Sequence, residues 1–281
     1  MKIKSKQNED RAKGRVIDYF GPKYWEMCGI SYFSSDINEL LRVLSGRMEV
    51  NGEKTWLTTV NPEFVMAARG DSDFTDIINK SDIKVVDGIG LIWAREVLKS
   101  PRGPKRWWRA LTVGVEILRG KRRRGLISGA DLIMDLSKMA AEKKQKIFLL
   151  GGWENRASES GKFLAEKFPG LKYDFCQGEP VVKNEEVINR INKFEPDYLL
   201  VAYGMKKQEE WIERNLAKLK LKVIIGVGRS FDYYSGALKR APGWVRKMGL
   251  EWLYSLIKEP KRFKRQLVLP KFVWMVLTEI A

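Results

Sequence analysis

The stretch "WLTTVNPEFVMAAR" (residues 56–69) joins a β-rich run to a helix-forming run through Asn61 and Pro62. An Asn side chain accepts hydrogen bonds from the free amides of a first helical turn, and Pro lacks the amide that would go unpaired there. We therefore expect a strand over residues 56–60 and a helix that begins directly after Asn61. Thr59 and Asn61 would then lie where this strand meets its helix.

The same pattern, a β-rich run followed by polar residues or glycine, recurs along the chain. Further β-rich runs end in polar residues or glycine, namely "DIKVV" (82–86), "QKIFLL" (145–150), "DYLLVAYG" (197–204) and "KVIIGVG" (222–228). Helical spacing of apolar residues follows in "ADLIMDLSKMAAEKK" (130–144) and "NEEVINRINKF" (184–194). This rhythm predicts an α/β core over residues 24–236, a Rossmann-like and mostly parallel sheet with flanking helices. Ligands of such sheets bind beyond the carboxyl ends of the strands.

The composition restricts the chemistry. The 281 residues, 44% of them hydrophobic, suffice for a sizeable core, and none of them is histidine. The usual proton shuttle and the commonest zinc ligand are therefore absent, so an acid or base must be Asp, Glu, Lys, Tyr or Cys. Cys28 and Cys176 lack the paired spacing of a metal or redox motif, which indicates reduced core residues in a cytoplasmic protein.

The net charge of +17 favours a polyanionic partner, either nucleic acid or an anionic membrane surface. The first residues are polar and charged, without the apolar segment of a secretory signal. We expect residues 1–23 to form a disordered basic tail and the chain to stay on the cytoplasmic side.

Two regions break the βα rhythm. Residues 99–125 interleave ten Lys and Arg with Trp107 and Trp108. They read equally well as a basic insertion on a membrane surface and as a solvated loop and helix with two core tryptophans. The second region, residues 237–281, ends in the apolar "QLVLPKFVWMVLTEIA", which Pro270 interrupts and which is shorter than the ~20 residues that span a bilayer. It predicts a helical appendage that associates with the membrane interface.

Several sites are excluded or disfavoured by pattern. A dinucleotide fingerprint needs a third glycine where "GIGLIW" and "GVGRSF" carry Trp93 and Phe231. The lysine-bearing phosphate loop is absent. "DSD" (71–73) has the carboxylates of a divalent metal site, but its position near a helix end favours a solvated surface.

Asp87 directly follows the run "DIKVV", and Gly88 and Gly90 come after it in the sequence. A carboxylate at a strand's carboxyl end, beside glycines that let a substrate approach the backbone, can accept a proton from a hydroxyl group. The same residue can equally cap the helix that starts near Gly90. The residues alone leave both interpretations open.

Several blocks, in order from about residue 28 to 265, resemble one family of bacterial glycosyltransferases. They are "TTVNPEFVMAAR", "IKVVDGIGLIWA", "ISGADLI", "IFLLGG", "PDYLLVAYGMKKQEEWI", "IIGVGRSFDYYSG", "KRAPGWVRKMGLEWLY" and "EPKRFKRQ". Together they resemble the WecG/TagA/CpsF family. The resemblance implies an inverting enzyme without metal or other cofactor, which moves an N-acetylmannosamine-type sugar from a UDP donor to a polyprenyl-diphosphate-linked N-acetylglucosamine. It implies work in cell-surface polysaccharide or teichoic acid synthesis, peripherally at the cytoplasmic face of the plasma membrane.

The resemblance also implies roles at the strand ends. Asp87 would be the base that deprotonates the acceptor hydroxyl, and Thr59 and Asn61 would line the same cleft and hydrogen-bond the sugars. Gln208 and Glu209 match the family's Gln-Glu pair as candidates for sugar or phosphate contacts.

The remaining candidates concern the phosphates and the nucleoside. Gly151 and Gly152 would let backbone amides approach the diphosphate, and Asp232 would hold the nucleoside. Arg262 and Arg265 match two arginines after "EP" and would reach the acceptor diphosphate or neutralise the leaving UDP. A further candidate for this contact is Arg240.

The chain departs from the family pattern at four positions, which are Lys206 for Pro, Arg229 for Gly, Ser255 for Arg and Leu126 for Arg. Arg124 or Arg229 would supply missing charge. Other interpretations are a relative that uses a mannosaminuronate- or glucose-type donor, and a nucleic-acid-binding protein, which needs the basic residues to form a groove. We expect the enzyme, with no nucleic acid bound, and leave self-association into a homo-oligomer open.

Overall fold

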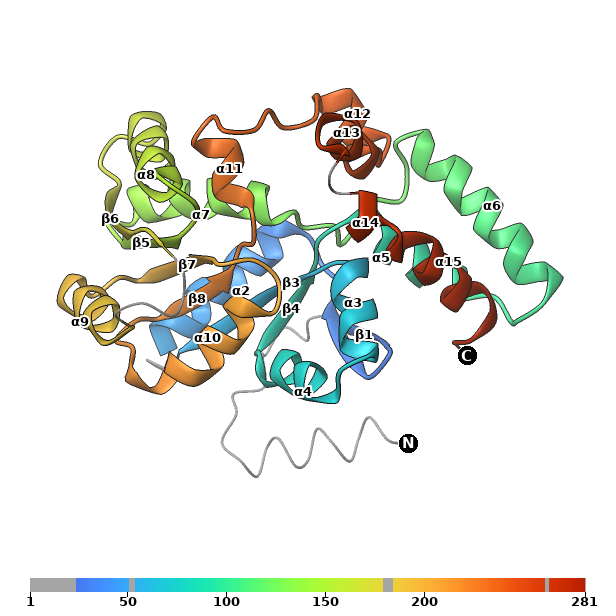
Figure 1. Cartoon of the computed structure of the whole chain (residues 1–281), viewed down its shortest axis with the longest axis horizontal. Helices are drawn as coiled ribbons and strands as arrows, with labels where there is room; N and C mark the ends of the chain where they lie inside the picture. Colours follow the sequence, from blue (N-terminus) through green and yellow to red (C-terminus); the bar gives the residue numbers. More distant parts are fainter. Residues whose placement is uncertain (1–23, 51–53, 179–183, 261–262, 281) are drawn as a thin grey trace.

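The computed structural model describes residues 24–50, 54–178, 184–260 and 263–280. Its six-stranded parallel sheet has the order β4-β3-β8-β7-β5-β6. The strands are β3 (Thr55–Val60), β4 (Ile83–Val86), β5 (Lys146–Gly151), β6 (Lys172–Cys176), β7 (Tyr198–Ala202) and β8 (Val223–Gly226). An antiparallel hairpin precedes them, β1 (Tyr24–Met27) and β2 (Ile30–Phe33). The predicted α/β fold is confirmed (Figure 1).

The inner strands are buried on both faces, which explains their almost continuous apolar sequences. Successive side chains of a strand point to opposite faces. In β7, Tyr198 and Leu200 therefore join one core, and Leu199 and Val201 join the other. The predicted strand runs coincide with β3, β4, β5, β7 and β8 to within a few residues.

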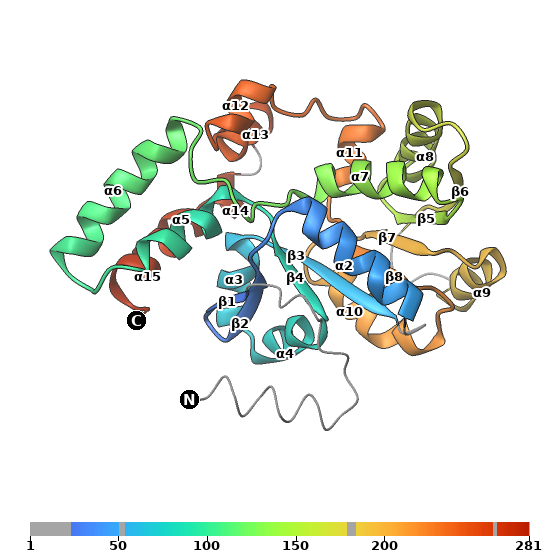
Figure 2. The ribbon, with the colours of Figure 1, turned by 180° about the vertical axis from the view of Figure 1, so that it is seen from behind.

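Helices cover both faces of the sheet (Figures 1 and 2). One core is closed by α2 (Ile37–Val50), α7 (Gly129–Glu142), α8 (Arg156–Lys167) and the short α11 (Ser230–Tyr234). The opposite core is closed by α9 (Asn184–Phe194), α10 (Lys207–Asn215) and the 3-10 turn η1 (Leu216–Lys218). The predicted helices over 130–144 and 184–194 are thus present as α7 and α9.

A third core lies beside β4 and contains the end of the chain. It is built from the hairpin β1–β2 with α3 (Pro62–Arg69), α4 (Ser72–Lys80), α5 (Ile89–Val97), α6 (Pro104–Leu118) and α15 (Val268–Thr278). Before α15 come α12 (Gly243–Lys247), α13 (Glu251–Lys258) and α14 (Phe263–Gln266). Phe272, Met275 and Val276 of α15 are almost fully buried, so the last helix packs into the protein on one side.

Pro270 does not interrupt the C-terminal helix, contrary to our expectation. It lies in the first turn of α15, where a backbone N–H has no intrahelical partner and proline therefore costs little. Within the described residues, no helix is both long enough and apolar enough to cross a bilayer. The tail expected over residues 1–23 lies outside the described residues.

The strand β6 and the hairpin β1–β2 do not appear in the sequence-based prediction. Most residues of β6 are partly exposed and include Lys172 and Asp174, because this strand forms the edge of the sheet. Its sequence therefore lacks the apolar run on which the other strands were predicted.

The segment that precedes α6 and the start of α6 anchor the last turn of α15. The guanidinium group of Arg106, 2% exposed, donates to the carbonyl oxygens of Val276 and Ile280 at 3.2 and 2.5 Å. Arg102 donates to Glu279 O and Ile280 O. These bonds occupy carbonyl groups that a helix C-terminus leaves without partners.

Replacing Arg106 by Leu should therefore lower the free energy of unfolding by about 2–4 kcal/mol, because the carbonyl groups lose a buried charged donor. Urea unfolding followed by circular dichroism measures the change. Lys105→Leu, at an exposed neighbouring position, is the matched control and should change the value by less than about 0.5 kcal/mol. Equal stabilities of the two variants would contradict the anchoring role.

Candidate functional site

The carboxyl ends of β3 and β4 bring three of the predicted residues together. The strands pair in parallel with Thr59 opposite Val85 and Val60 opposite Val86. The amide of Asp87 then continues this ladder by donating to Val60 O at 2.8 Å. The strands β3 and β4 are parallel neighbours in the sheet (Figure 1). Asn61 and Asp87, which directly follow them, therefore lie at the same end of the sheet.

Asn61 is the N-cap of α3, as its sequence predicts. Its Oδ1 accepts from the amide of Phe64 at 3.1 Å, and Pro62 occupies the first helical position. The side-chain amide of Asn61 is left to bind other groups, since the cap uses only the oxygen.

The two glycines after Asp87 serve packing. A Cβ on Gly90 would lie 2.7 Å from Pro62 Cγ, so only glycine lets α5 begin this close to α3. Gly88 has φ +110° and is itself the N-cap of α5. Our expectation that these glycines make room for a substrate is thus wrong for Gly90, whose space Pro62 fills. Asp87 is not the cap of α5.

The carboxyl group of Asp87 instead faces the start of α7. A Cβ on Gly129, the first residue of α7, would lie 3.7 Å from Asp87 Oδ2, 3.6 Å from Thr59 Cγ2 and 3.5 Å from Ser230 Oγ. Asp87, Thr59 and Ser230 thus converge on a residue without a side chain. A helix N-terminus stabilises a negative charge placed there, through free amides and the helix dipole.

Burial raises the pKa of Asp87 to about 7, and the negative charges of Glu251 and Asp131 act in the same direction. Arg240 and the amide of Gly129 act in the opposite direction. A carboxyl group in this balance exchanges its proton near neutral pH, as a general base must.

Arg240 is held by the charges around Asp87. It donates to both carboxylate oxygens of Asp131 at 2.5 and 2.9 Å, to Glu251 Oε1 at 3.1 Å and to Ser128 Oγ at 3.1 Å. These bonds join α7 to α13, so the C-terminal helices complete the surroundings of Asp87. The guanidinium group of Arg240 has little donor capacity left for a phosphate in this arrangement.

Gln208 and Glu209, in the first turn of α10, are almost fully buried. Gln208 Nε2 donates to Glu209 Oε1 at 2.7 Å, and Gln208 Oε1 accepts from the amide of Gly228 at 3.0 Å. Thr59 Oγ1 donates to Gly226 O at 3.0 Å. These side chains fix the turn after β8, and burial raises the pKa of Glu209 to about 7.

Gly151, the last residue of β5, and Gly152 after it have left-handed conformations, with φ +92° and +79°. A Cβ on Gly151 would lie 2.7 Å from the ring of Tyr203, so this glycine makes room for a side chain of its own protein. Next to it is a cavity of about 230 Å³, lined by Gly152, Trp153, Glu154, Gly178, Ala202, Tyr203 and Lys207.

Asp232 is buried and both of its carboxylate oxygens are engaged. Oδ1 accepts from Arg156 and Oδ2 from Arg229, each at 2.8 Å. Arg229 also reaches Glu259 Oε2, the residue after α13, at 2.9 Å. Asp232 therefore organises two arginines between the core and the C-terminal helices, a role that its sequence pattern did not predict.

Arg265 in α14 lies at the start of α3. Its Nη2 donates to Glu63 Oε2 at 2.6 Å, and Glu63 belongs to the helix that Asn61 caps. Half of the Arg265 side chain is exposed, at 51%. The other predicted arginine, Arg262, lies outside the described residues. Arg124, a substitute for missing charge, is exposed, and its carbonyl oxygen accepts from Arg95.

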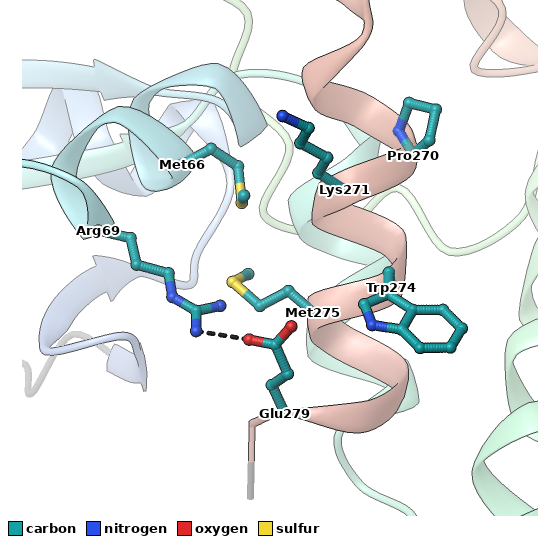
Figure 3. Close-up of a pocket in the computed structure, with 7 residues that line it drawn as sticks. All are labelled: Met66, Arg69, Pro270, Lys271, Trp274, Met275 and Glu279. Carbon is teal, nitrogen blue, oxygen red and sulfur yellow. Dashed lines mark ion pairs between the residues drawn. The ribbon is translucent and has the colours of Figure 1, made fainter.

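A larger cavity, about 500 Å³, lies elsewhere and contains none of the predicted residues (Figure 3). It opens between α3 and α15 and is lined by Met66, Arg69, Pro270, Lys271, Trp274, Met275 and Glu279. Arg69 and Glu279 form an ion pair across it at 2.5 Å. The cavity lies beside the second half of α3, whereas Asn61 precedes the first turn of this helix. The cavity is therefore separate from the site around Asp87.

The acidic stretch "DSD" begins with a helix cap. Asp71 Oδ1 accepts from the amide of Phe74 at 3.0 Å, and Oδ2 pairs with Lys206 at 2.6 Å. Over the described part of the chain, no group of three or more Asp, Glu or Cys side chains is arranged to hold a metal ion.

Four residues near Asp87 were absent from our candidates, namely Gly129, Asp131, Ser230 and Glu251. The blocks "ISGADLI" and "GLEWLY" contain three of them, and "GVGRSF" contains the fourth. Their proximity to Asp87 depends on contacts between distant segments, which spacing along one segment cannot reveal.

Comparison with known proteins gives a consistent result. The profile of the glycosyl transferase WecG/TagA/CpsF family matches residues 25–109 and 109–281. An N-acetylglucosaminyldiphosphoundecaprenol N-acetyl-beta-D-mannosaminyltransferase of Staphylococcus aureus strain MRSA252 is 32% identical over 222 residues, which is 79% of each chain. Proteins of the same name from strains MW2 and NCTC 8325 are 31% identical over the same share.

The raised pKa of Asp87 has a consequence for stability. Because the folded protein binds this proton more tightly than the unfolded chain, ionisation of Asp87 destabilises the fold as pH rises from about 4 to about 7. Asp87→Asn removes that cost. We expect the variant to be more stable than the wild type at pH 8 by about 1–3 kcal/mol and nearly equal at pH 4.

Urea unfolding at the two pH values measures this difference. Asp36→Asn, at an exposed position before α2, is the control, because Asn can still accept the hydrogen bond from the amide of Glu39. Its stability relative to the wild type should be the same at both pH values. An Asp87→Asn variant no more stable than the wild type at pH 8 would contradict the raised pKa of this partly buried carboxyl group.

Proposed function

Because the chain belongs to the WecG/TagA/CpsF family and is a glycosyltransferase, we propose that it transfers an N-acetylmannosamine-type sugar from UDP to a polyprenyl-diphosphate-linked N-acetylglucosamine. The observation that carries the proposal is the convergence of Asp87, Thr59 and Asn61 at the carboxyl edge of β3 and β4, with a carboxyl pKa of about 7. The names of the relatives supply the donor and acceptor classes.

In this reaction Asp87 is the base. Its carboxylate takes the proton of an acceptor hydroxyl while that oxygen bonds to the anomeric carbon of the donor sugar. The bond from this carbon to the β-phosphate oxygen breaks, and its electron pair leaves with UDP. Attack from the face opposite UDP inverts the anomeric centre. The diphosphate leaves without a strong acid, so one carboxylate suffices and no histidine or metal ion is needed.

The surrounding groups suit that role. The amides at the start of α7 stabilise the ionised carboxylate, while Glu251 and Asp131 keep it basic enough to accept a proton. The side-chain amide of Asn61 is placed to donate to a sugar hydroxyl or carbonyl. Thr59 acts mainly through its bond to Gly226, which holds β3 and β8 together at the site.

For the donor, we propose that the cavity beside Gly152 receives the nucleoside and that the Gly152 region carries the diphosphate. Tyr203 and Trp153 offer aromatic surface to a base, and Lys207 offers a positive charge. Gln208, Glu209 and Asp232 then act as positioning residues, because their polar atoms bind the turn after β8 and Arg229.

The C-terminal helices are the proposed binding site of the acceptor diphosphate. We propose that Arg265 binds it at the start of α3 and exchanges its partly shielded ion pair with Glu63 for a doubly charged group. Arg262, which lies outside the described residues, is proposed to share this role. Arg240 instead fixes α13 against α7. The exposed apolar side chains of α12 to α15, including Trp244 and Ile257, would contact the inner face of the plasma membrane that holds the lipid.

Asp87→Asn should lower the rate of disaccharide formation at least about 100-fold while UDP binding stays unchanged. The measurement supplies UDP-N-acetylmannosamine and a lipid-diphosphate N-acetylglucosamine. Asp135→Asn is the matched control, because Asp135 is also a partly buried Asp with a raised pKa but lies further along α7. Near-normal turnover of Asp87→Asn would contradict the proposal that Asp87 is the base.

Two additions to this assay separate the alternatives. Activity should survive EDTA, and loss of activity there would implicate a divalent metal. A panel of UDP-sugars tests the donor. Faster turnover of a mannosaminuronate or glucose derivative would indicate that this sugar, and not N-acetylmannosamine, is the donor.

The pH profile of kcat/KM should rise with pH to a plateau above about 7, because only the ionised Asp87 accepts a proton. Glu251→Gln removes a negative charge that raises this pKa, so the acid limb should move down by about 0.5–1 pH unit. Glu251→Asp keeps the charge and should leave the limb in place. Unchanged profiles in both variants would contradict the proposed coupling between α13 and Asp87.

A further inference from the structure

The helix α6 carries an apolar row that faces solvent. Its buried face consists of Arg106, Ala110, Val113 and Ile117. On another face, Trp108 is 69% exposed, Leu111 65%, Val115 45% and Leu118 46%. These four residues follow one another at steps of three and four, so they form a continuous stripe along the helix. Large apolar side chains gathered this way usually mark an interaction site.

The stripe continues onto the C-terminal helix. Trp107, 45% exposed, meets Trp274 of α15, 57% exposed, edge to face with ring centroids 6.4 Å apart. Figure 3 shows Trp274 on the side of α15 away from Arg69. The two helices lie side by side at one end of the molecule (Figures 1 and 2). Their exposed tryptophans thus belong to one surface, which we call the α6 face, made of Trp107, Trp108, Leu111, Val115, Leu118 and Trp274.

Cations flank the α6 face. Lys105 precedes the apolar row, and Arg119, Lys121 and Arg124 follow it, all exposed. The sequence of α6 contains one acidic residue, Glu116, which Arg122 engages at 2.6 Å. An apolar centre with positive ends fits the interface of an anionic bilayer, where tryptophan rings lie at headgroup depth and cations meet lipid phosphates.

Other occupants fit less well. A second copy of the chain would bring the same positive charge to the interface, in a protein with a net charge of +17. Single-stranded nucleic acid binds aromatic rings within a basic groove, whereas the middle of the α6 face consists of Leu111, Val115 and Leu118.

We propose that α6 is a membrane-binding element in its own right, which places the apolar row of the α6 face in the interfacial layer of an anionic bilayer. It adds a second contact to the proposed one of the C-terminal helices. Since Arg106 and Trp107 tie α6 to α15, these two helices meet the lipid surface as one unit.

The test is sedimentation of the full chain with vesicles of phosphatidylcholine and phosphatidylglycerol. The double variant Trp108→Ser with Leu111→Ser removes the two most exposed side chains of the row and should weaken partitioning at least about ten-fold. Phe163→Ser is the matched control and should bind like the wild type. Phe163 is an exposed apolar residue of α8, a helix that lies at the other end of the molecule from α6 (Figure 1). Unchanged partitioning of the double variant overturns the proposal.

A conservative variant guards against misfolding. Trp108→Phe should retain partitioning but reduce the quenching of tryptophan fluorescence by lipids with brominated acyl chains, and undiminished quenching would contradict insertion of Trp108. If the double variant instead dissociates an oligomer of the free protein while vesicle binding stays intact, the α6 face is a contact between copies and the proposal fails. No sugar substrate enters these measurements, so their outcome is separate from that of the proposed transfer reaction.

Discussion

The contact between Gly90 and Pro62 is the constraint on which the site depends. Pro62 occupies the space that a side chain at position 90 would need, which lets the starts of α3 and α5 meet. Because these helices follow neighbouring parallel strands, their close approach brings Asn61 and Asp87 to one point of the sheet edge. A larger residue at position 90 would push the helices apart and separate the proposed base, Asp87, from Asn61.

Charge holds the C-terminal helices against this edge. Arg240 joins Glu251 of α13 to Asp131 of α7, Arg229 joins Glu259 to Asp232, and Arg265 joins α14 to Glu63 of α3. Each pair is partly shielded from water, so together they fix the geometry of the helices more than any exposed pair would. Several of the chain's many cations therefore have partners within the protein.

Local patterns predicted most of the fold because their causes are local. The cap at Asn61 and the apolar strand runs depend on neighbours in sequence, and they appear in the structure where expected. The site was predicted less fully. Gln208 and Glu209 are polar residues near a strand end, but both side chains are buried. Gln208 bonds to the amide of Gly228, and Glu209 bonds to Gln208 and to the amide of Lys206. From the sequence, the tryptophans of α6 can be core or surface residues, because the packing of α5 and α15 against α6 decides which helix face is left exposed.

The position of Glu251 links proton affinity to the arrangement of helices. Glu251 belongs to α13, outside the sheet and its covering helices, yet its charge raises the pKa of Asp87. A molecule in which α13 had left its place would lose this repulsion and some burial of the carboxyl group, and both changes lower the pKa. The carboxylate of Asp87 would then bind a proton less tightly and be a weaker proton acceptor. The proton affinity of Asp87 is thus a property of the assembled protein, and it reports whether the last helices are in place.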